Sequence, residues 1–200
     1  YMRGMDTKDR IMYVAMDLIS AKGFRAVTIK EVAAGAGVSE MTVFRKFTSK
    51  KNMLMEAFDR FSVSFPFQEI FHDQLTGNPD IDLMNICKAH YKHLEHNRRL
   101  MNIFLKEDNN IPELRAKIRQ FPVEMKKHLI AYFEQMQKEG KLPKANAELQ
   151  YNSFSTVAVG QFWWRMFIND NPAEQVLDSD VNTVLEYSVR AFLHGLKAQG

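Results

Sequence analysis

The chain has 200 residues, 46% of them hydrophobic, which is enough to bury a sizeable core in one domain or in two. No run approaches about 18 uninterrupted apolar residues and the N-terminus has no apolar signal-peptide core, so we expect neither a membrane span nor secretion but a cytoplasmic protein. The net charge of +3 is uneven: residues 1–56 carry ten Lys/Arg against six Asp/Glu and the rest carries seventeen against eighteen, a pattern typical of a nucleic-acid-binding segment.

The first predicted helix covers Thr7–Lys22 and is ended by Gly23. Its apolar residues recur at helical spacing on one face, namely Ile11, Val14, Ala15, Leu18 and Ile19. We expect this face to pack across the two short helices that follow and to hold them rigid.

Residues 28–50 predict two short helices around a tight turn. Thr28 caps the first of them and Glu31 reaches back to Thr28, a capping box that satisfies two otherwise unpaired backbone donors. The apolar face of this helix consists of Ile29, Val32, Ala33 and Ala36. Gly35 and Gly37 are expected to break it, because glycine enters left-handed backbone at little energetic cost.

The second short helix is predicted to begin after Ser39, whose hydroxyl is a suitable N-cap. Its inward face is assigned to Val43, Phe44 and Phe47, with Val43 filling the seam between the two helices. Its exposed side carries Glu40, Met41, Thr42, Arg45 and Lys46. Residues 41–51 include four basic residues and no acidic one. This arrangement suits a helix-turn-helix that places one helix in the DNA major groove; a helical hairpin in an ordinary bundle is the alternative.

Residues 8–54 resemble the DNA-binding head of the TetR family of one-component bacterial regulators. The resemblance is carried by residues 15–18, Gly23, Thr28, Ile29, Val32, Ala33, 36–39, Thr42, Val43, Phe44, Phe47, Ser49 and Lys50. Two positions depart from the family pattern. Phe44 stands where Tyr is usual and lacks its hydroxyl, and Met41 stands where a small residue is common and turns a flexible apolar side chain toward the groove.

These residues predict the contacts with DNA. Bases are expected to be read by Met41, Thr42 and Arg45, while Phe44 packs at the groove wall. Phosphates are expected to be held by Thr28, Ser39, Lys46 and Lys50. Phosphate contacts fix the register of a protein on the duplex, whereas base contacts select the sequence.

The next helix is predicted to begin after Ser49, with Lys50 and Lys51 in its first turn. Cations at a helix N-terminus oppose the helix dipole, so a DNA phosphate is the expected reason for them. An apolar stripe that continues to Phe65 is formed by Met53, Leu54, Ala57, Phe58 and Phe61. Pro66 interrupts it. We expect this helix to begin beside the DNA, to end inside a second domain and to transmit signals between the two.

From residue 66 the composition changes to long amphipathic helices rich in Phe and Met, expected at about 67–74, 81–97, 99–106, 112–139, 146–168 and 179–197. Pro122 is expected to kink or split the fourth of them. Turns separate the helices at 76–79, 108–110, 140–143 and 170–172. No strand pattern of convincing length is present. The sequence therefore predicts an all-α protein, with a three-helix helix-turn-helix domain at 1–50 and a helical bundle at 51–200, for which the family resemblance implies ligand binding and dimerisation.

The last two predicted helices are apolar over more than one face. The first carries Tyr151, Phe154, Val157, Ala158, Gln161, Phe162, Trp164, Arg165 and Phe167, and the second carries Val181, Val184, Leu185, Val189, Phe192, Leu193 and Leu196. Helices too apolar for one core imply a further partner. The family resemblance implies a four-helix bundle with a two-fold mate, whose symmetry suits two inverted half-sites. The alternative is that both faces are covered within one subunit.

The family resemblance also implies an effector site in the helical domain. The candidate lining residues are Phe65, Met84, Cys87, Tyr91, Met101, Phe104, Met125, Phe133, Phe162, Trp163 and Met166. Met and aromatic side chains adapt to varied apolar ligands, although core packing is the other explanation for such residues. Few charges interrupt the set, so the expected effector is small and mostly apolar or cationic-aromatic.

Other site chemistry has little support in the sequence. His90, His93 and His96 recur every three residues, but such steps drift around a helix and no Cys or second acidic cluster is taken to adjoin them, so they are interpreted as surface or rim histidines and not as metal ligands. The single cysteine, Cys87, excludes an internal disulfide and suits a reducing compartment. No phosphate loop, nucleophile elbow or zinc-protease motif is present, so the sequence predicts neither a cofactor nor an enzyme.

The sequence thus predicts a homodimeric, ligand-responsive transcriptional repressor that binds a palindromic operator. Two other classes remain open. One is a DNA-bound structural or division-control protein whose helical domain binds another protein, and DNA binding that ignores small molecules would favour it. The other is a helical enzyme that uses the aromatic residues as a cavity, which only turnover surviving loss of the basic head would favour.

Overall fold

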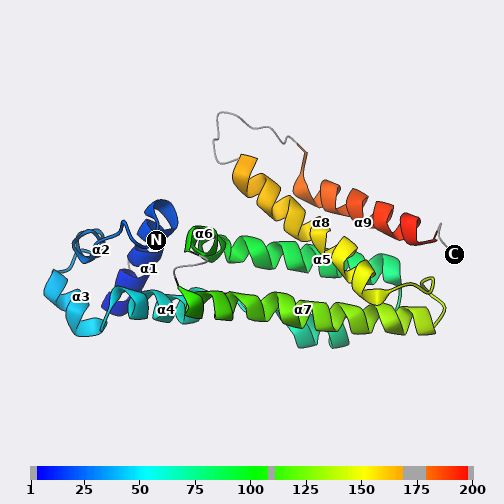
Figure 1. Cartoon of the computed structure of the whole chain (residues 1–200), viewed down its shortest axis with the longest axis horizontal. Coiled ribbons are helices and arrows are strands. Elements are labelled where there is room, and N and C mark those ends of the chain that lie inside the picture. The colour runs from blue at the N-terminus through cyan, green and yellow to red at the C-terminus, as the bar shows by residue number, and fades with distance from the viewer. Residues whose placement is uncertain (1–3, 108–110, 169–178, 198–200) are drawn as a thin grey trace. The chain divides into compact units, whose positions relative to one another are not determined.

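A computed structural model of the chain describes residues 4–107, 111–168 and 179–197. Its helices are α1 (Thr7–Lys22), α2 (Ile29–Ala36), α3 (Glu40–Lys46), α4 (Lys50–Phe61), the short π-helix η1 (Glu69–Asp73), α5 (Pro79–His96), α6 (Arg98–Glu107), α7 (Pro112–Lys138), α8 (Ala147–Ile168) and α9 (Val181–Lys197) (Figure 1). No strand occurs in these residues, which confirms the all-α class. None of the helices found there is long and apolar enough to cross a membrane. The turns predicted at 108–110 and 170–172 lie outside the described residues.

The chain divides into two compact units. The first is taken from Tyr1–Val63 and His96–Arg119, and the second from Ser64–Glu95 and Gln120–Gly200. Helices α4 and α6 and the first turns of α7 therefore belong with the N-terminal helices. The boundary between the compact units does not fall at residue 50. The predicted roles, DNA binding by residues 1–50 and ligand binding and dimerisation by residues 51–200, stay predictions.

Helix α4 ends at Phe61, inside the first unit, so the predicted helix that runs on into a second domain is wrong. Phe58 and Phe61 pack against the core of the first unit, whereas Phe65 lies in the core of the second. Val63 lies between Phe61 and Phe65 in the sequence. The Asn97 side chain accepts a hydrogen bond from the Val63 N–H at 2.9 Å and donates one to the Val63 carbonyl at 3.0 Å. Asn97 thus gives both backbone groups of Val63 a hydrogen-bond partner, so these groups do not need the partners that a longer helix would supply.

Helix α1 is the centre of the first unit, because α2, α4 and α6 all pack against it. The face predicted from the sequence is buried or half-buried as expected. Met12, Met16 and Ser20 are buried as well, although they lie outside that face. A helix with neighbours on several sides is buried on several sides, which a one-face pattern does not reveal.

The two glycines of the helix-turn-helix have different roles. Gly37 ends α2 in the left-handed region, with a φ of 64°, as predicted. Gly35, predicted as a helix breaker, instead lies inside α2, and a Cβ atom there would stand 2.7 Å from Val14 Cγ1. Gly35 therefore allows α2 to approach α1 closely and does not form a turn.

The core of the second unit is built by η1, α5, α7, α8 and α9. Phe133 on α7 and Phe154 on α8 are fully buried, and their rings meet edge to face with centroids 6.1 Å apart. Helices α8 and α9 lie side by side (Figure 1). Helix α7 is continuous through Pro122, so of the predicted kink or split the split is wrong. A proline removes one backbone donor, and the remaining hydrogen bonds keep this helix continuous.

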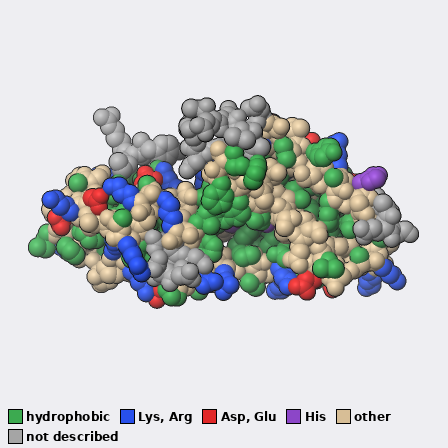
Figure 2. Space-filling view, turned by 45° about the horizontal axis from the view of Figure 1, so that its top comes forward, with side chains coloured by type: hydrophobic (Ala, Val, Ile, Leu, Met, Phe, Trp, Pro, Cys, Tyr) green, Lys and Arg blue, Asp and Glu red, His purple; other side chains and the backbone are tan. Residues whose placement is uncertain are grey.

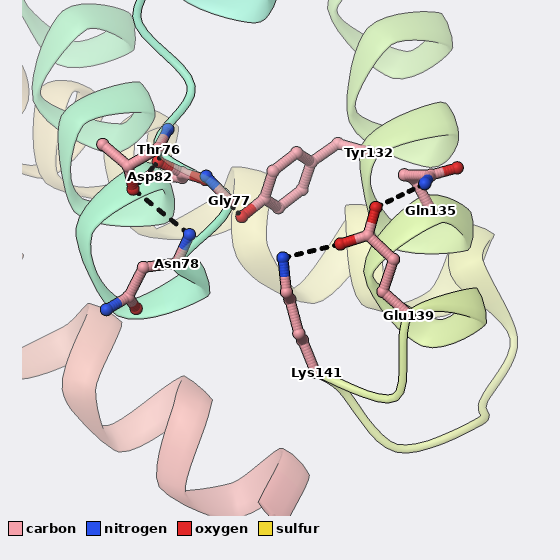
Figure 3. A network of polar contacts seen from close by, with 8 residues as sticks. All are labelled: Thr76, Gly77, Asn78, Asp82, Tyr132, Gln135, Glu139 and Lys141. Atoms are coloured by element: carbon pink, nitrogen blue, oxygen red, sulfur yellow. Dashed lines mark hydrogen bonds and ion pairs between the residues drawn. The ribbon is translucent and has the colours of Figure 1, made fainter.

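A buried carboxylate fixes the start of α5. Asp82 accepts hydrogen bonds from the N–H and the hydroxyl of Thr76, at 2.8 and 2.7 Å, and from the Gly77 N–H at 3.0 Å (Figure 3). The Tyr132 hydroxyl donates to the same carboxylate at 3.2 Å. Burial, and then the nearby Asp82, raise the pKa of Tyr132 well above its usual range, so the phenol remains a donor. Because these groups are paired, the network serves to hold α5 and α7 together.

Candidate nucleic-acid interface

Helix α3 is held by two buried side chains and a cap. Val43 and Phe47, four residues apart on one face, are buried in the core of the first unit. Ser39 caps the helix as predicted, because its hydroxyl accepts from the Thr42 N–H at 3.2 Å. Ser49 caps α4 in the same way. The opposite side of α3 is thereby held toward solvent.

The exposed side of α3 is partly hydrophobic. Met41 is 73% exposed and Phe44 is 59% exposed, and residues three apart are neighbours on a helix surface. Thr42 is half-buried. We define the α3 surface as Met41, Thr42 and Phe44 together with the exposed Glu40, Arg45 and Lys46. Hydrophobic side chains appear together with Lys and Arg side chains at the surface where α3 lies (Figure 2).

The structure corrects the inward assignment of Phe44. Val43 and Phe47 occupy the buried face of α3, and Phe44 follows Val43 about 100° further round the helix. Its ring therefore points out of the core. The predicted packing of Phe44 against the wall of the DNA groove requires an exposed ring of this kind, and it stays a prediction.

Thr28 lies exposed at the start of α2, where the predicted capping box is confirmed. Its hydroxyl donates to the Glu31 carboxylate at 2.9 Å and accepts from the Glu31 N–H at 3.2 Å. Glu31 also pairs with Lys22 at 2.8 Å. The hydrogen bond from Lys22, followed by those from Thr28, lowers the pKa of Glu31 to about 2. A phosphate contact at Thr28 therefore competes with the cap.

Lys50 and Lys51 both have acceptors within the protein. Lys50 Nζ donates to the Val27 carbonyl at 2.6 Å and to the Phe24 carbonyl at 2.5 Å, and it lies 4.5 Å from the centroid of the Phe24 ring. Lys51 pairs with Glu113 at 2.5 Å. These contacts account for two cations at the start of α4 without a phosphate. Sequence reasoning missed them because the partners are 23 to 62 residues away; the phosphate contact of Lys50 stays a prediction.

The predicted effector residues do not all belong to one unit. Met101 and Phe104 lie on α6 in the first unit, where Met101 packs against the core. The others lie in the second unit, namely Phe65, Met84, Cys87, Tyr91, Met125, Phe133, Phe162, Trp163 and Met166. Burial raises the pKa of Cys87 to about 12, so its thiol stays protonated and unreactive. Core packing explains several members of the set, and its role in effector binding stays a prediction.

The interpretation of His90 as a surface or rim residue is wrong, and Cys87 does adjoin it, three residues earlier on α5. His90 is 3% exposed, His93 is half-buried and His96 is exposed. Each step of three residues falls about 60° short of a full helical turn, which carries the series from the core to solvent. Within the described ranges, no group of three or more His, Cys, Asp or Glu side chains is placed to hold a metal ion.

Helices α8 and α9 leave large hydrophobic side chains uncovered. Trp164 is 52% exposed and Phe167 is 64% exposed, and Leu149 and Tyr187 are exposed as well. Other apolar residues of both helices are buried in the core of the second unit, including Phe154 and Val189. Helix α8 is thus apolar on more than one side, as predicted. The apolar residues predicted on α9 are all buried or half-buried, so a second apolar face is not found on α9, where Tyr187 is the exposed aromatic side chain.

Two protein families match separate parts of the chain. Residues 11–57 match the family described as bacterial regulatory proteins of the tetR family. Residues 83–195 match the C-terminal domain of AefR-like transcriptional repressors, a match that alone covers more than half of the chain. The first match includes all of α2 and α3, the elements that form the candidate interface.

Relatives cover nearly the whole chain. The sequence is 28% identical over 192 residues to YvkB, an uncharacterised HTH-type transcriptional regulator of Bacillus subtilis strain 168, spanning 96% of this chain and 98% of YvkB. The ketosteroid transcriptional regulator KstR2 of Mycobacterium tuberculosis has a similar structure, with a TM-score of 0.71, 19% identity and coverage of 96% of this chain and 95% of that chain. FadR of Bacillus subtilis, solved in complex with stearoyl-CoA, has a TM-score of 0.63, 16% identity and coverage of 93% and 97%. At such identities the two structures show a shared fold.

Proposed function

This chain belongs to the TetR family of bacterial regulatory proteins, and from that membership we propose that it is a ligand-responsive repressor that binds a palindromic operator as a homodimer in the cytoplasm. The observation that carries the proposal is the α3 surface. Val43 and Phe47 anchor the helix, while Met41, Phe44 and the basic side chains face solvent. The family consists of transcriptional regulators, so no catalytic activity is proposed.

The α3 surface supplies the proposed DNA contacts. The apolar side chain of Met41 suits the methyl group of thymine, and the Arg45 guanidinium suits the O6 and N7 atoms of guanine. Thr42 completes the base-reading set and Phe44 packs against the groove wall. Lys46 is exposed and provides the most available phosphate contact. The other proposed phosphate contacts already have partners within the protein, namely Thr28, Ser39 and Lys50.

Dimerisation is proposed to occur through α8 and α9. The exposed Trp164 and Phe167 support this, because large apolar side chains gathered on one helix favour a partner surface. A two-fold pair repeats the α3 surface and so suits two inverted half-sites. An effector that prefers a different spacing of the two heads weakens operator binding by its differential affinity, typically about 1–3 kcal/mol.

The effector is proposed to be small and mostly apolar or cationic-aromatic. It is proposed to bind within residues 51–200, while residues 1–50 bind DNA. The aromatic and Met side chains of the second unit support this. The names of two structural neighbours, a ketosteroid regulator and a FadR solved with stearoyl-CoA, also refer to largely apolar compounds.

Selection from a randomised duplex library tests the proposal. The purified chain is expected to enrich an inverted repeat, because a symmetric dimer presents two identical reading surfaces. Affinity for the enriched duplex is expected to fall steeply as salt rises, since phosphate contacts release counterions. Failure to retain any duplex at low salt, or enrichment of a single unrepeated half-site, contradicts the proposal.

Thr42→Ala tests base reading within the same selection. It is expected to relax discrimination at one position of each half-site by about 1–3 kcal/mol, the usual value of one specific base contact. Ser64→Ala, which also removes an exposed hydroxyl but lies outside α3, α8 and α9, is the control and is expected to leave the consensus unchanged. An unchanged consensus for Thr42→Ala would show that this side chain does not read a base.

A further inference from the structure

Side chains of the second unit form an aromatic–histidine cluster, defined by Phe65, Phe67, His90, His93, Phe121 and His128. His93 stacks on Phe121 with ring centroids 4.2 Å apart, and Phe67 stacks on His128 at 4.9 Å. Phe65 joins the two pairs, because its ring lies 5.5 Å from Phe121 and 4.8 Å from Phe67. The cluster therefore offers ring faces and ring edges to a flat molecule.

His90 is the most deeply buried histidine of this cluster. It is 3% exposed, and its ring lies 5.1 Å from that of Phe121. Its Nδ1 atom is buried and has no hydrogen-bond partner in the part of the chain that the structure describes. A polar atom buried without a partner destabilises the folded state, so its presence in a native fold needs a reason. A ligand atom that pairs with Nδ1 is such a reason.

The polar groups beside the buried ring are uncharged. Burial, followed by the neighbouring His93, lowers the pKa of His90 to about 3, so its imidazole is neutral near pH 7. A neutral imidazole has one donor and one acceptor. Cys87 precedes His90 by three residues on α5 and is a protonated thiol, because burial raises its pKa to about 12. Neither group supplies a counter-charge.

Ionic groups near this part of α5 already have partners. Lys88 pairs with Glu186 at 2.6 Å, and Glu95 accepts a hydrogen bond from the Tyr91 hydroxyl at 2.9 Å. A carboxylate or an ammonium group brought between the neutral His90 and Cys87 would lose its hydration without gaining an opposite charge from either side chain, which is unfavourable. An uncharged polar group avoids this cost.

We propose that the aromatic–histidine cluster binds an uncharged aromatic molecule with one hydroxyl group, which pairs with His90 Nδ1 while the aromatic ring lies against Phe121. A hydroxyl both donates and accepts, so it suits either tautomer of His90. Phe121 and His93 are half-buried, so this side of the cluster is partly exposed to solvent. The identification of this molecule as the effector rests on the proposed function.

Four matched probes test the site by calorimetry on the full chain: naphthol, methylnaphthalene, naphthoate and naphthylmethylammonium, all substituted at the same ring carbon. Naphthol is expected to bind about tenfold more tightly than methylnaphthalene, the gain from one hydrogen bond to an otherwise unpaired atom. Both ions are expected to bind more weakly than methylnaphthalene, because their charge must be desolvated. Equal binding of naphthol and methylnaphthalene, preferential binding of an ion, or no binding of any probe overturns the proposal.

His90→Phe assigns the preference to one side chain, because it keeps a ring and removes both nitrogens. The preference for naphthol over methylnaphthalene, about tenfold in the unaltered chain, is expected to vanish while methylnaphthalene still binds. His96→Phe, an exposed histidine at the end of α5, is the control and is expected to keep the preference. A preference that survives His90→Phe contradicts the site. If His90→Phe does not fold, NMR spectra of the unaltered chain test the site instead. The imidazole nitrogen resonances of His90 must then shift when naphthol is added and not when methylnaphthalene is added.

A separate measurement distinguishes this site from the proposed regulatory function. Retention of the selected duplex is compared with and without naphthol. Naphthol that binds through His90 without changing retention leaves the site in place and contradicts its identification as the effector site. Specific retention of an inverted repeat, without a preference for naphthol over methylnaphthalene, contradicts the site and leaves the DNA-binding function in place.

Discussion

Basic side chains near α3 have different environments although they look alike in the sequence. Lys46 is exposed on the α3 surface. Lys50 donates to the carbonyls of Phe24 and Val27, which lie in the connection between α1 and α2. An exposed ammonium is available to a phosphate, whereas one that holds two carbonyls also stabilises the fold. Replacement of the two lysines is therefore expected to have different results.

Lys46→Ala is expected to weaken binding to all duplexes alike and to reduce the slope of log K against log salt by about one, with no change in stability. Lys50→Met is expected to lower the free energy of unfolding by about 1–3 kcal/mol, because two part-buried carbonyls lose their donor. Salt titration of operator binding and urea denaturation measure the two effects. A Lys50→Met variant as stable as the unaltered chain would show that these hydrogen bonds contribute nothing.

Gly35 is expected to tolerate no side chain. Gly35→Ala places a Cβ atom 2.7 Å from Val14 Cγ1 and is expected to lower the free energy of unfolding by about 1–3 kcal/mol. Val14→Ala removes that atom, so Gly35→Ala is expected to cost less in the Val14→Ala background. Urea denaturation of the four members of this double-mutant cycle measures the coupling. Additive effects would mean that close approach to Val14 is not the reason for the glycine.

At the level of elements, the first four helices all begin with a side-chain cap. Asp6, Thr28, Ser39 and Ser49 each accept a hydrogen bond from the backbone N–H three residues later. Such caps stabilise helices as short as α2 and α3, which have little helix-forming capacity of their own. The cap of α2 also includes the charged group of Glu31, so the stability of this element depends on pH.

The contribution of Glu31 is expected to disappear in acid. The hydrogen bond from Lys22, followed by those from Thr28, lowers the pKa of Glu31 from 4.5 to about 2. A carboxylate with a lowered pKa stabilises the fold above its unfolded-state pKa, and this stabilisation is lost as pH falls from 4.5 toward 2. Thermal melts should therefore show a difference in Tm between the unaltered chain and Glu31→Ala that is largest near about pH 6 and shrinks below about pH 4.5. A difference independent of pH contradicts this account.

At the scale of the whole molecule, α8 and α9 face both a core and solvent. Phe154 and Val189 are buried with the rest of the second unit, while Trp164 and Phe167 remain exposed. Side chains of this size are usually covered, and in the proposed dimer a second copy of the chain would cover them symmetrically. The proposed dimer would thus complete the burial of two helices and pair two DNA-reading surfaces.

Trp164→Asp is expected to convert the dimer into a monomer, because a carboxylate buried in an apolar interface has no partner. Sedimentation equilibrium measures the association, and affinity for the full inverted repeat is expected to fall to that for one half-site. Val123→Asp is the matched control, since Val123 is 63% exposed on α7, and it is expected to stay dimeric. A Trp164→Asp variant that remains a dimer would place the interface elsewhere.

Features that depend on residues close together in the chain were predictable. Intrahelical hydrogen bonds and caps join residues three or four apart, so a short stretch of sequence contains the information for them. Most helix bounds were predicted to within two residues of those observed, whereas α4 ends at Phe61 and not near Phe65. The caps at Thr28, Ser39 and Ser49 were predicted as well. The solvent-facing positions of Met41, Arg45 and Lys46 follow from the same periodicity.

Features that depend on distant segments became clear only in the folded chain. The need for glycine at position 35 comes from Val14 on another helix. The position of the Lys50 side chain is explained by two carbonyls more than 20 residues away in the sequence. The unusual environment of His90 comes from its burial beside Phe121. Helical periodicity shows which residues share a face but not which face another helix will cover, because that choice is made by packing between elements. For this protein, local hydrogen bonding thus specified the helices and most of the α3 surface. Packing between segments specified the outward position of Phe44, the close helix crossing, the paired lysines and the buried histidine.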